Sequence, residues 1–222
     1  VLAGGFLLGA WSSISPAIGQ KYTNRVTHGD HIALGHFGSL AYYISAWVGS
    51  KAGKAEDNIE SMEIPEKWAF LKDTNVSTAL TMIVFFLLAA FAAGPDYVST
   101  ISHGMSPVIF AIMAGLEFAV GVAVVSSGIN MMLGDLIPAF KGVSEKVIPN
   151  AVPAVDCVAF FNYAPTAVVL GFVSSFIGGV LGMLILGFAG GVLIVPGLVA
   201  HFFCGAAAGI FGNATGGRRG AA

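Results

Sequence analysis

Charged side chains are scarce in this sequence. Only 10% of its 222 residues are Asp, Glu, Lys or Arg, whereas 56% are hydrophobic and the mean hydropathy is +0.83. Soluble domains carry about 25% charged residues, and one core could not bury this much apolar surface. The composition therefore excludes an ordinary soluble domain and favours a membrane protein. The net charge of −2 and the lack of a basic arm give no basis for a nucleic-acid partner.

Cysteine is also rare, and Cys157 and Cys204 both lie in apolar surroundings. Two such thiols predict no disulfide framework. No Walker loop, dinucleotide fingerprint, HExxH or CxxC motif is present, so a soluble catalytic domain is not indicated. His28 and His31 lie near Asp30, but no further ligands follow at a helpful spacing. We therefore expect no metal and no other cofactor.

Long apolar runs are what the sequence has in abundance. A membrane-spanning helix needs about 20 mostly apolar residues. Spans are predicted at residues 1–19, 76–93 and 107–133, with two more inside 166–217. Pro16 should end the first span, and the last pair should divide near Gly187–Gly191. The expected fold class is an all-α membrane protein with polytopic transmembrane helices.

The distribution of basic residues predicts the topology. Lys and Arg occur in segment 50–73, which reads as solvated, in 141–146 and at Arg218–Arg219, but not in loop 94–106. The positive-inside rule places the basic segments in the cytoplasm. The two spans inside 166–217 can then leave and return only if Val152–Pro165 enters and exits on one side. We therefore predict a re-entrant hairpin there, with non-helical backbone satisfied by protein or a water-filled cavity.

Asp156, inside this hairpin, is the most informative residue. A carboxylate in hydrocarbon costs at least about 2.5–3.5 kcal/mol, so it must face a cavity, a partner or a ligand. An ionised carboxylate accepts hydrogen bonds well from a polyhydroxylated ligand, although a structural pairing remains an alternative. Asn162 either contacts a ligand or satisfies the broken backbone. His36, next to Gly35 and close to Gly38, either binds a ligand or is structural.

The residues around Asp156 resemble a known family. Segment 138–172, which contains Val-Pro-Ala-Val-Asp-Cys-Val-Ala-Phe-Phe-Asn-Tyr-Ala-Pro, is similar to the ascorbate-type IIC permeases of the sugar phosphotransferase system (PTS). Segments 34–38 and 201–219 are similar to the same family. The resemblance implies a homodimeric permease of the bacterial inner membrane, with inverted repeats, re-entrant hairpins, a substrate-carrying core and a dimer-forming domain. The chain would be the middle and later part of such a protein, truncated at both ends.

The resemblance also implies a substrate and partners. The substrate would be L-ascorbate or a related polyol or sugar acid, bound by His36, Phe37, Asp156 and Asn162. Phe37 stands where family members carry glutamine, and its ring can stack on a substrate ring. A separate cytoplasmic IIB protein, supplied by IIA, would phosphorylate the substrate, so the chain itself would not be an enzyme. The alternative is an ion- or proton-coupled transporter of a sugar-like or organic-acid solute, using Glu117 and Asp156.

The expected domain organisation follows from these segments. Residues 1–49 would form a transmembrane segment and a polar re-entrant region of the substrate-carrying core. Residues 50–75 would form a cytoplasmic connector, amphipathic around Ile64–Leu71, with Trp68, Phe70 and Leu71 at the membrane interface. Residues 76–137 would form two transmembrane helices. Residues 138–222 would contain a cytoplasmic loop, the hairpin and two transmembrane segments of the second repeat.

Overall fold

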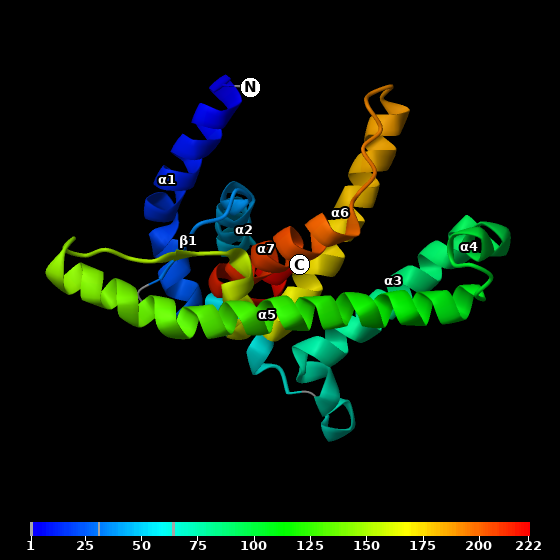
Figure 1. Ribbon diagram of the computed structural model, residues 1–222, viewed down its shortest axis with the longest axis horizontal. Helices are drawn as coiled ribbons and strands as arrows, with labels where there is room; N and C mark the ends of the chain where they lie inside the picture. Colours follow the sequence, from blue (N-terminus) through cyan, green and yellow to red (C-terminus); the bar gives the residue numbers. More distant parts are fainter. Residues whose placement is uncertain (1, 31, 64) are drawn as a thin grey trace. The chain divides into compact units, whose positions relative to one another are not determined.

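The computed structural model describes residues 2–30, 32–63 and 65–222 and is mostly helical (Figure 1). It forms two compact units, one made of residues 1–63 and 129–222 and the other of residues 64–128. In chain order the elements are α1 (Leu2–Val26), β1 (Ala33–Leu34), α2 (Ser39–Ala52), the 3-10 helices η1 (Ala55–Asp57), η2 (Ile59–Ser61) and η3 (Glu66–Lys72), α3 (Thr74–Ala93), α4 (Pro95–Ile101), α5 (Pro107–Lys146), β2 (Ala154–Val155), η4 (Cys157–Tyr163), α6 (Pro165–Phe188) and α7 (Leu198–Ala221).

Five helices in the described part of the chain are long and apolar enough to cross a membrane: α1, α3, α5, α6 and α7. This confirms the expected all-α polytopic class, and the break between α6 and α7 follows Phe188, as predicted. The expectation that Pro16 ends the first span is wrong, because α1 continues through Pro16 to Val26. A proline removes a single N–H donor, and membrane helices tolerate this loss when neighbouring groups satisfy the freed carbonyl.

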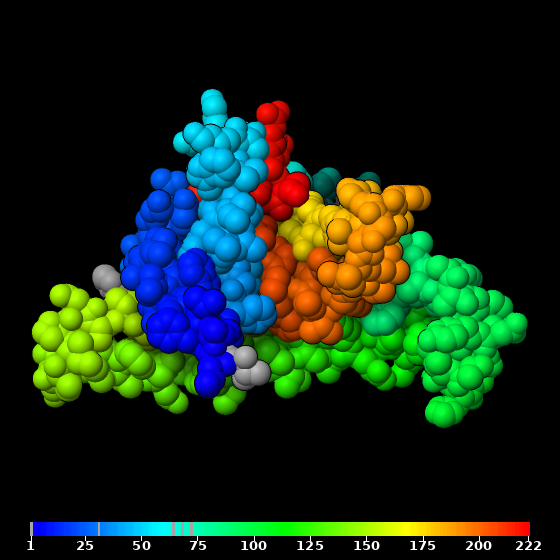
Figure 2. Space-filling model, turned by 90° about the horizontal axis from the view of Figure 1, so that it is seen from above, coloured from blue at the N-terminus to red at the C-terminus, as the bar shows by residue number. Residues whose placement is uncertain are grey.

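Helix α7 forms the centre of the first unit and packs against α2 and α6 (Figure 1). Figure 2 shows α1 and α2 side by side on the same unit. Aromatic rings fill the interior: the Phe211 ring centroid lies 5.9 Å from that of Tyr42 and 5.8 Å from that of Phe160. All three side chains are fully buried. This aromatic core joins α2, η4 and α7, the elements that surround the site described below.

Glycine allows α6 and α7 to approach closely. A Cβ atom added at Gly171 of α6 would lie on the carbonyl oxygen of Gly205 and 2.7 Å from the Cα atom of Gly209, both on α7. The Gly205–Gly209 pair has the small-xxx-small spacing of closely packed membrane helices. The contact between the two backbones therefore depends on the missing side chains.

The first unit also contains a pair of very short strands that the sequence did not indicate. β1 and β2 are parallel, with Ala33 opposite Ala154 and Leu34 opposite Val155. Two backbone hydrogen bonds hold them, from Ala33 N to the Pro153 oxygen and from Gly35 N to the Val155 oxygen, each 2.8 Å long. Strands of two residues are too short to show a hydrophobic period of their own.

Part of segment 50–73, expected to be solvated, belongs to the first unit and packs against its α7. Ile59 is buried, and its backbone N–H donates to the Asn213 side-chain oxygen of α7 at 3.0 Å. The Asn213 amide in turn donates to the Asn58 side-chain oxygen at 2.8 Å. The solvated interpretation is therefore wrong for these residues, because buried polar groups of α7 bind them. Ile64 lies outside the described residues, as does the Trp68 side chain, while Phe70 is exposed.

Glu60 makes a second attachment, to the start of α6. Its carboxylate accepts a hydrogen bond from the Thr166 hydroxyl at 2.8 Å and from the Ala167 backbone N–H at 2.9 Å. The first N–H groups of a helix lack partners within the helix and favour a nearby negative charge. Glu60 therefore caps α6 from a segment more than 100 residues away in sequence.

The second unit is a small helical assembly of α3, α4 and the first part of α5. Asp73 caps α3 by accepting from the backbone N–H groups of Asn75 and Val76 at 2.8 and 3.1 Å. The hydrophobic core of the second unit is formed by Ala90, Val98 and Ala111, with Phe86, Leu87 and Phe110 packed around them.

Candidate functional site

The parallel strand pair explains how two distant segments form one site. Parallel strands point the same way, so their carboxyl ends meet at the same edge. His36 follows β1 by two residues, and Asp156 directly follows β2. Polar side-chain atoms of His36, Asp156 and Cys157 all lie within 4.8 Å of one another. The structure thus brings together the histidine and the carboxylate that the sequence singled out separately.

His36 is half-buried and is held by its neighbours through one ring nitrogen. The backbone N–H of Gly38 donates to His36 Nδ1 at 3.0 Å, and the Tyr42 hydroxyl oxygen lies 2.7 Å from the same atom. The Tyr42 ring is stacked on the imidazole with centroids 5.6 Å apart. Burial lowers the pKa of His36 below its ordinary value, and the charge of Asp156 only partly offsets this effect. Burial therefore favours the neutral imidazole.

Asp156 presents an exposed carboxylate at the start of η4, where its side chain makes no capping hydrogen bond. The neighbouring Cys157 is buried, and burial is the main reason why its pKa is raised above the ordinary value for a thiol. It therefore stays protonated and is a poor nucleophile. Of this pair, the carboxylate is the group available to a ligand.

Phe37 and Asn162 occupy different surroundings. The Phe37 ring centroid lies 4.2 Å from that of His36, and the side chain is 66% exposed. It borders the His36–Asp156 site as an open aromatic face. The Asn162 amide instead donates to the Asn130 side-chain oxygen of α5 at 3.0 Å. The structure therefore places Asn162 against α5, whereas His36 lies in the loop between β1 and α2.

His36, Asp156 and Cys157 have side chains of the types that bind metals, but their local bonding favours an organic ligand. His36 Nδ1 accepts the Gly38 N–H and has the Tyr42 hydroxyl 2.7 Å away, so this nitrogen is not open to a metal. A metal needs a deprotonated thiolate, whereas the raised pKa of Cys157 favours the neutral thiol. Of the two histidines considered from sequence, His28 is exposed and His31 lies outside the described residues.

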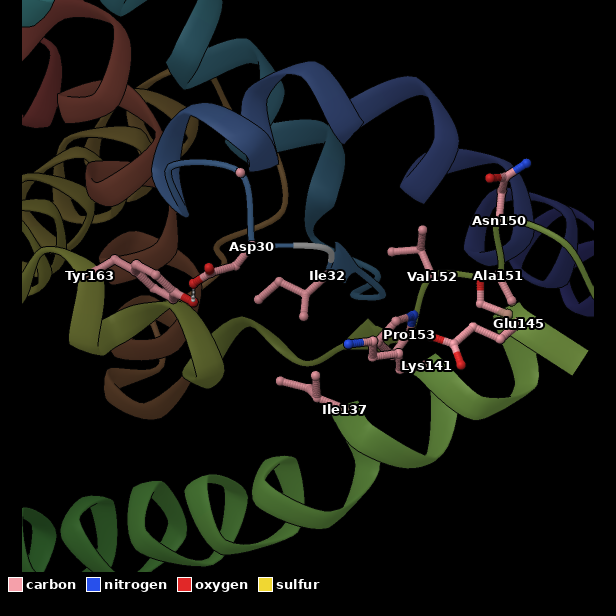
Figure 3. A pocket seen from close by; sticks show the side chains of 12 residues that line it. Asp30, Ile32, Ile137, Lys141, Glu145, Asn150, Ala151, Val152, Pro153 and Tyr163 are labelled. Carbon is pink, nitrogen blue, oxygen red and sulfur yellow. Dashed lines mark hydrogen bonds between the residues drawn. The ribbon is translucent and has the colours of Figure 1, made fainter.

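A cavity lies beside β1 and β2, within the first unit. Its volume is about 730 Å³, and its wall includes Asp30, Lys141, Glu145, Pro153 and Tyr163. Figure 3 shows Asp30 and Tyr163 at one end, joined by a 2.8 Å hydrogen bond from the Tyr163 hydroxyl to the carboxylate. Pro153 pairs with β1 through its backbone oxygen, so the cavity adjoins the strand that leads to Asp156.

The sequence did not reveal Tyr42 or Gly38 as parts of the site. Tyr42 is fully buried on α2, six residues after His36, and reads from sequence as an ordinary core aromatic. A Cβ atom at Gly38 would lie 2.8 Å from the Tyr42 hydroxyl and 3.1 Å from His36 Nδ1. The glycine is needed so that the tyrosine can reach the histidine. The Gly-His-Phe-Gly motif was the only sequence signal for this contact.

Comparison with known proteins identifies the family of the chain. A family described as "PTS system sugar-specific permease component" matches residues 1–222. The chain is also similar to a Mycoplasma pneumoniae protein named "Ascorbate-specific PTS system EIIC component", with 27% identity over 248 aligned residues. That alignment covers 98% of this chain and 37% of the relative, so the chain spans little more than a third of the relative's length. The chain belongs to the PTS sugar-specific permease family, as a IIC component, and is part of a multi-pass bacterial membrane protein.

Proposed function

We propose that the full-length protein imports L-ascorbate, or a closely related sugar acid or polyol, and releases it to a cytoplasmic IIB protein that phosphorylates it. The observation that carries the proposal is the convergence of His36 and Asp156 at the ends of β1 and β2. Similarity to the ascorbate-specific relative supports the choice of substrate. Phosphorylation after release would make uptake directional without an ion gradient.

The chemistry of the two side chains suits a polyhydroxylated ring. The Asp156 carboxylate accepts hydrogen bonds from hydroxyl groups, and the neutral imidazole of His36 has one nitrogen left to interact with the substrate. Helix α2 begins just beyond His36. Its amino-terminal end carries partial positive charge, which would weaken the repulsion between Asp156 and an anionic substrate such as ascorbate.

Phe37 would add an aromatic surface to this site. Its ring is exposed beside His36 and can stack on the face of a planar lactone ring. Asn162 would act at a distance, by fixing η4 to α5 through Asn130. The proposed roles therefore differ: His36, Phe37 and Asp156 contact the substrate, while Asn162 positions the segment that carries Asp156.

Uptake of labelled L-ascorbate by cells that carry the full-length protein tests this function. We expect accumulation only when a cognate IIB protein is present, and we expect the label inside the cells to be phosphorylated. Uptake that persists without IIB and collapses with a protonophore would favour an ion-coupled carrier instead. Purified full-length protein that binds labelled ascorbate equally well with His36→Ala would refute the proposed site.

A further inference from the structure

We infer that Tyr42 is a positioning residue that, together with the Gly38 backbone, holds His36 as the tautomer with its proton on Nε2, so that His36 offers the substrate a hydrogen-bond donor. This inference rests on the proposed function and specifies which side chain of the site donates a hydrogen bond to the substrate and which accepts one. Neither Tyr42 nor Gly38 was identified by sequence.

The two contacts at His36 Nδ1 determine the tautomer. A backbone N–H can only donate, so the 3.0 Å bond from Gly38 means that Nδ1 carries a lone pair and no proton. The Tyr42 oxygen lies 2.7 Å from the same nitrogen, and because Nδ1 carries no proton, the hydroxyl must be the donor in this contact. Because a neutral imidazole carries one proton, that proton is on Nε2.

Tyr42 is suited to this role because it remains a donor. Its side chain is fully buried, and burial, with the thiols of Cys157 and Cys204 nearby, raises its pKa. The stacked ring of Tyr42 and the ring of Phe37 fix the plane of the imidazole. Asp156, whose charge acts on His36, can only accept hydrogen bonds. It therefore cannot take over the role of Tyr42 as a donor to His36 Nδ1.

The site therefore combines one donor, His36 Nε2–H, with one acceptor, the Asp156 carboxylate. A matching ligand presents an acceptor oxygen and, within a few ångströms, a hydroxyl. The enediol of ascorbate has this combination, since one of its two oxygens is ionised at neutral pH and its other hydroxyls remain donors. A ligand that presents only hydroxyl hydrogens to both side chains should bind more weakly.

A double-mutant cycle on the purified full-length protein tests the inference. Tyr42→Phe removes the hydroxyl and keeps the ring that packs on Phe211. Loss of such a hydrogen bond should raise the Kd for labelled L-ascorbate about two- to tenfold. In a His36→Ala background the same substitution should have almost no effect, because Tyr42 acts through His36.

Tyr43→Phe is the matched control. Tyr43 is the next residue on α2, is also buried, and donates to the backbone oxygen of Ser15 at 3.0 Å. It should leave the Kd unchanged. An equal loss from Tyr42→Phe with and without His36 would overturn the inference, since Tyr42 would then act only through packing. No loss in the wild-type background would overturn it as well.

Nitrogen-15 spectroscopy of labelled histidine gives a second test that needs no substrate. The His36 signals, assigned with His36→Ala, should show an unprotonated Nδ1 and a protonated Nε2 at neutral pH. A protonated Nδ1 in the wild-type protein would overturn the inference and leave the proposed transport function intact. Loss of ascorbate binding in every variant and in wild type would instead refute the proposed substrate, while the spectrum would still decide the tautomer.

Discussion

At the scale of single residues, Asp156 carries the sharpest prediction. Asp156→Asn keeps the shape of the side chain and one acceptor oxygen but removes the charge. Hydrogen bonds to charged groups are worth about 1.5–3 kcal/mol, so the Kd for labelled ascorbate should rise about tenfold or more. Membrane expression should stay near the wild-type level, because the carboxylate is exposed and caps no helix.

Asp96→Asn provides the control for this measurement, because Asp96 is an exposed carboxylate on α4 in the other unit. It should leave the affinity unchanged. A structural role for Asp156 predicts the reverse pattern, with poorly folded protein and little change in the affinity of the folded fraction. Wild-type affinity in well-folded Asp156→Asn would therefore rule out the ligand role.

Sequence reasoning found the two polar ends of the site but not what holds them. A carboxylate inside an apolar, proline-bounded segment is rare enough to stand out, and so is a histidine flanked by glycines. Tyr42 does not stand out, since a buried aromatic on a helix is ordinary, and only the 2.7 Å contact with His36 points to its proposed role. Such contacts depend on tertiary packing, which one sequence does not encode in a local pattern.

At the scale of elements, the close approach of α6 and α7 predicts strong sensitivity at Gly171. Gly171→Ala would place a Cβ atom against the carbonyl of Gly205 and the Cα atom of Gly209, so the helices must separate. Overpacking of this kind costs about 1–3 kcal/mol. We expect a lower Tm and less folded protein after solubilisation.

Gly178→Ala is the matched control on the same helix, because a Cβ atom there meets no atom within 4 Å. Its stability should be unchanged or slightly higher, since alanine favours helix more than glycine does. Equal effects of the two substitutions would show that helix propensity, and not the α6–α7 contact, determines stability here.

The Glu60 cap on α6 leads to a second prediction for this pair of helices. Glu60→Ala would leave the Ala167 N–H and the Thr166 hydroxyl without their acceptor. Loss of a capping side chain costs about 0.5–2 kcal/mol, which should appear as a lower Tm. Glu60→Gln should recover part of it, because it retains an acceptor oxygen, whereas Glu56→Ala, on exposed η1, should have no effect. A Tm unchanged by Glu60→Ala would contradict the capping role.

The elements differed in how well the sequence predicted them. Long apolar runs produced the five candidate spans, because hydrophobic length is a strong local signal. The strands β1 and β2 were missed, since each needs its distant partner to form at all. Residues 58–61 are predicted to be solvated because the segment around them is charged. In the structure, Ile59 bonds to Asn213 of α7, and Glu60 bonds to the start of α6.

At the scale of the first unit, the contacts of residues 56–60 indicate which helix ends lie next to this segment. Glu60 binds the start of α6, while a small cavity brings Glu56 and Asp57 next to Arg218, near the end of α7. Helix α6 therefore begins, and α7 ends, beside the same segment. This arrangement supports the proposal that both helix ends lie in the cytoplasm with segment 50–75.

Residues near both ends of the segment between α5 and α6 line the cavity beside the strands. Asn150 and Tyr163 lie at opposite ends of this cavity, which Gly29 and Asp30 also line (Figure 3). Between them the backbone is extended in β2 and then turns into η4, with no helix long enough to span. The lack of a spanning helix between Asn150 and Tyr163 supports the proposal that Val152–Pro165 is a re-entrant hairpin and not a transmembrane span.

Cysteine labelling of intact cells and inverted vesicles tests this topology in the full-length protein. With Cys157 and Cys204 replaced by serine, Asn150→Cys and Thr166→Cys should react with a membrane-impermeant maleimide only in inverted vesicles. Ser99→Cys, on exposed α4 in the loop region without basic residues, should react only in intact cells. Because a spanning segment would put Asn150 and Thr166 on opposite sides, labelling of one position from each side would refute the hairpin. Reaction of both from outside would reverse the orientation predicted from the basic residues.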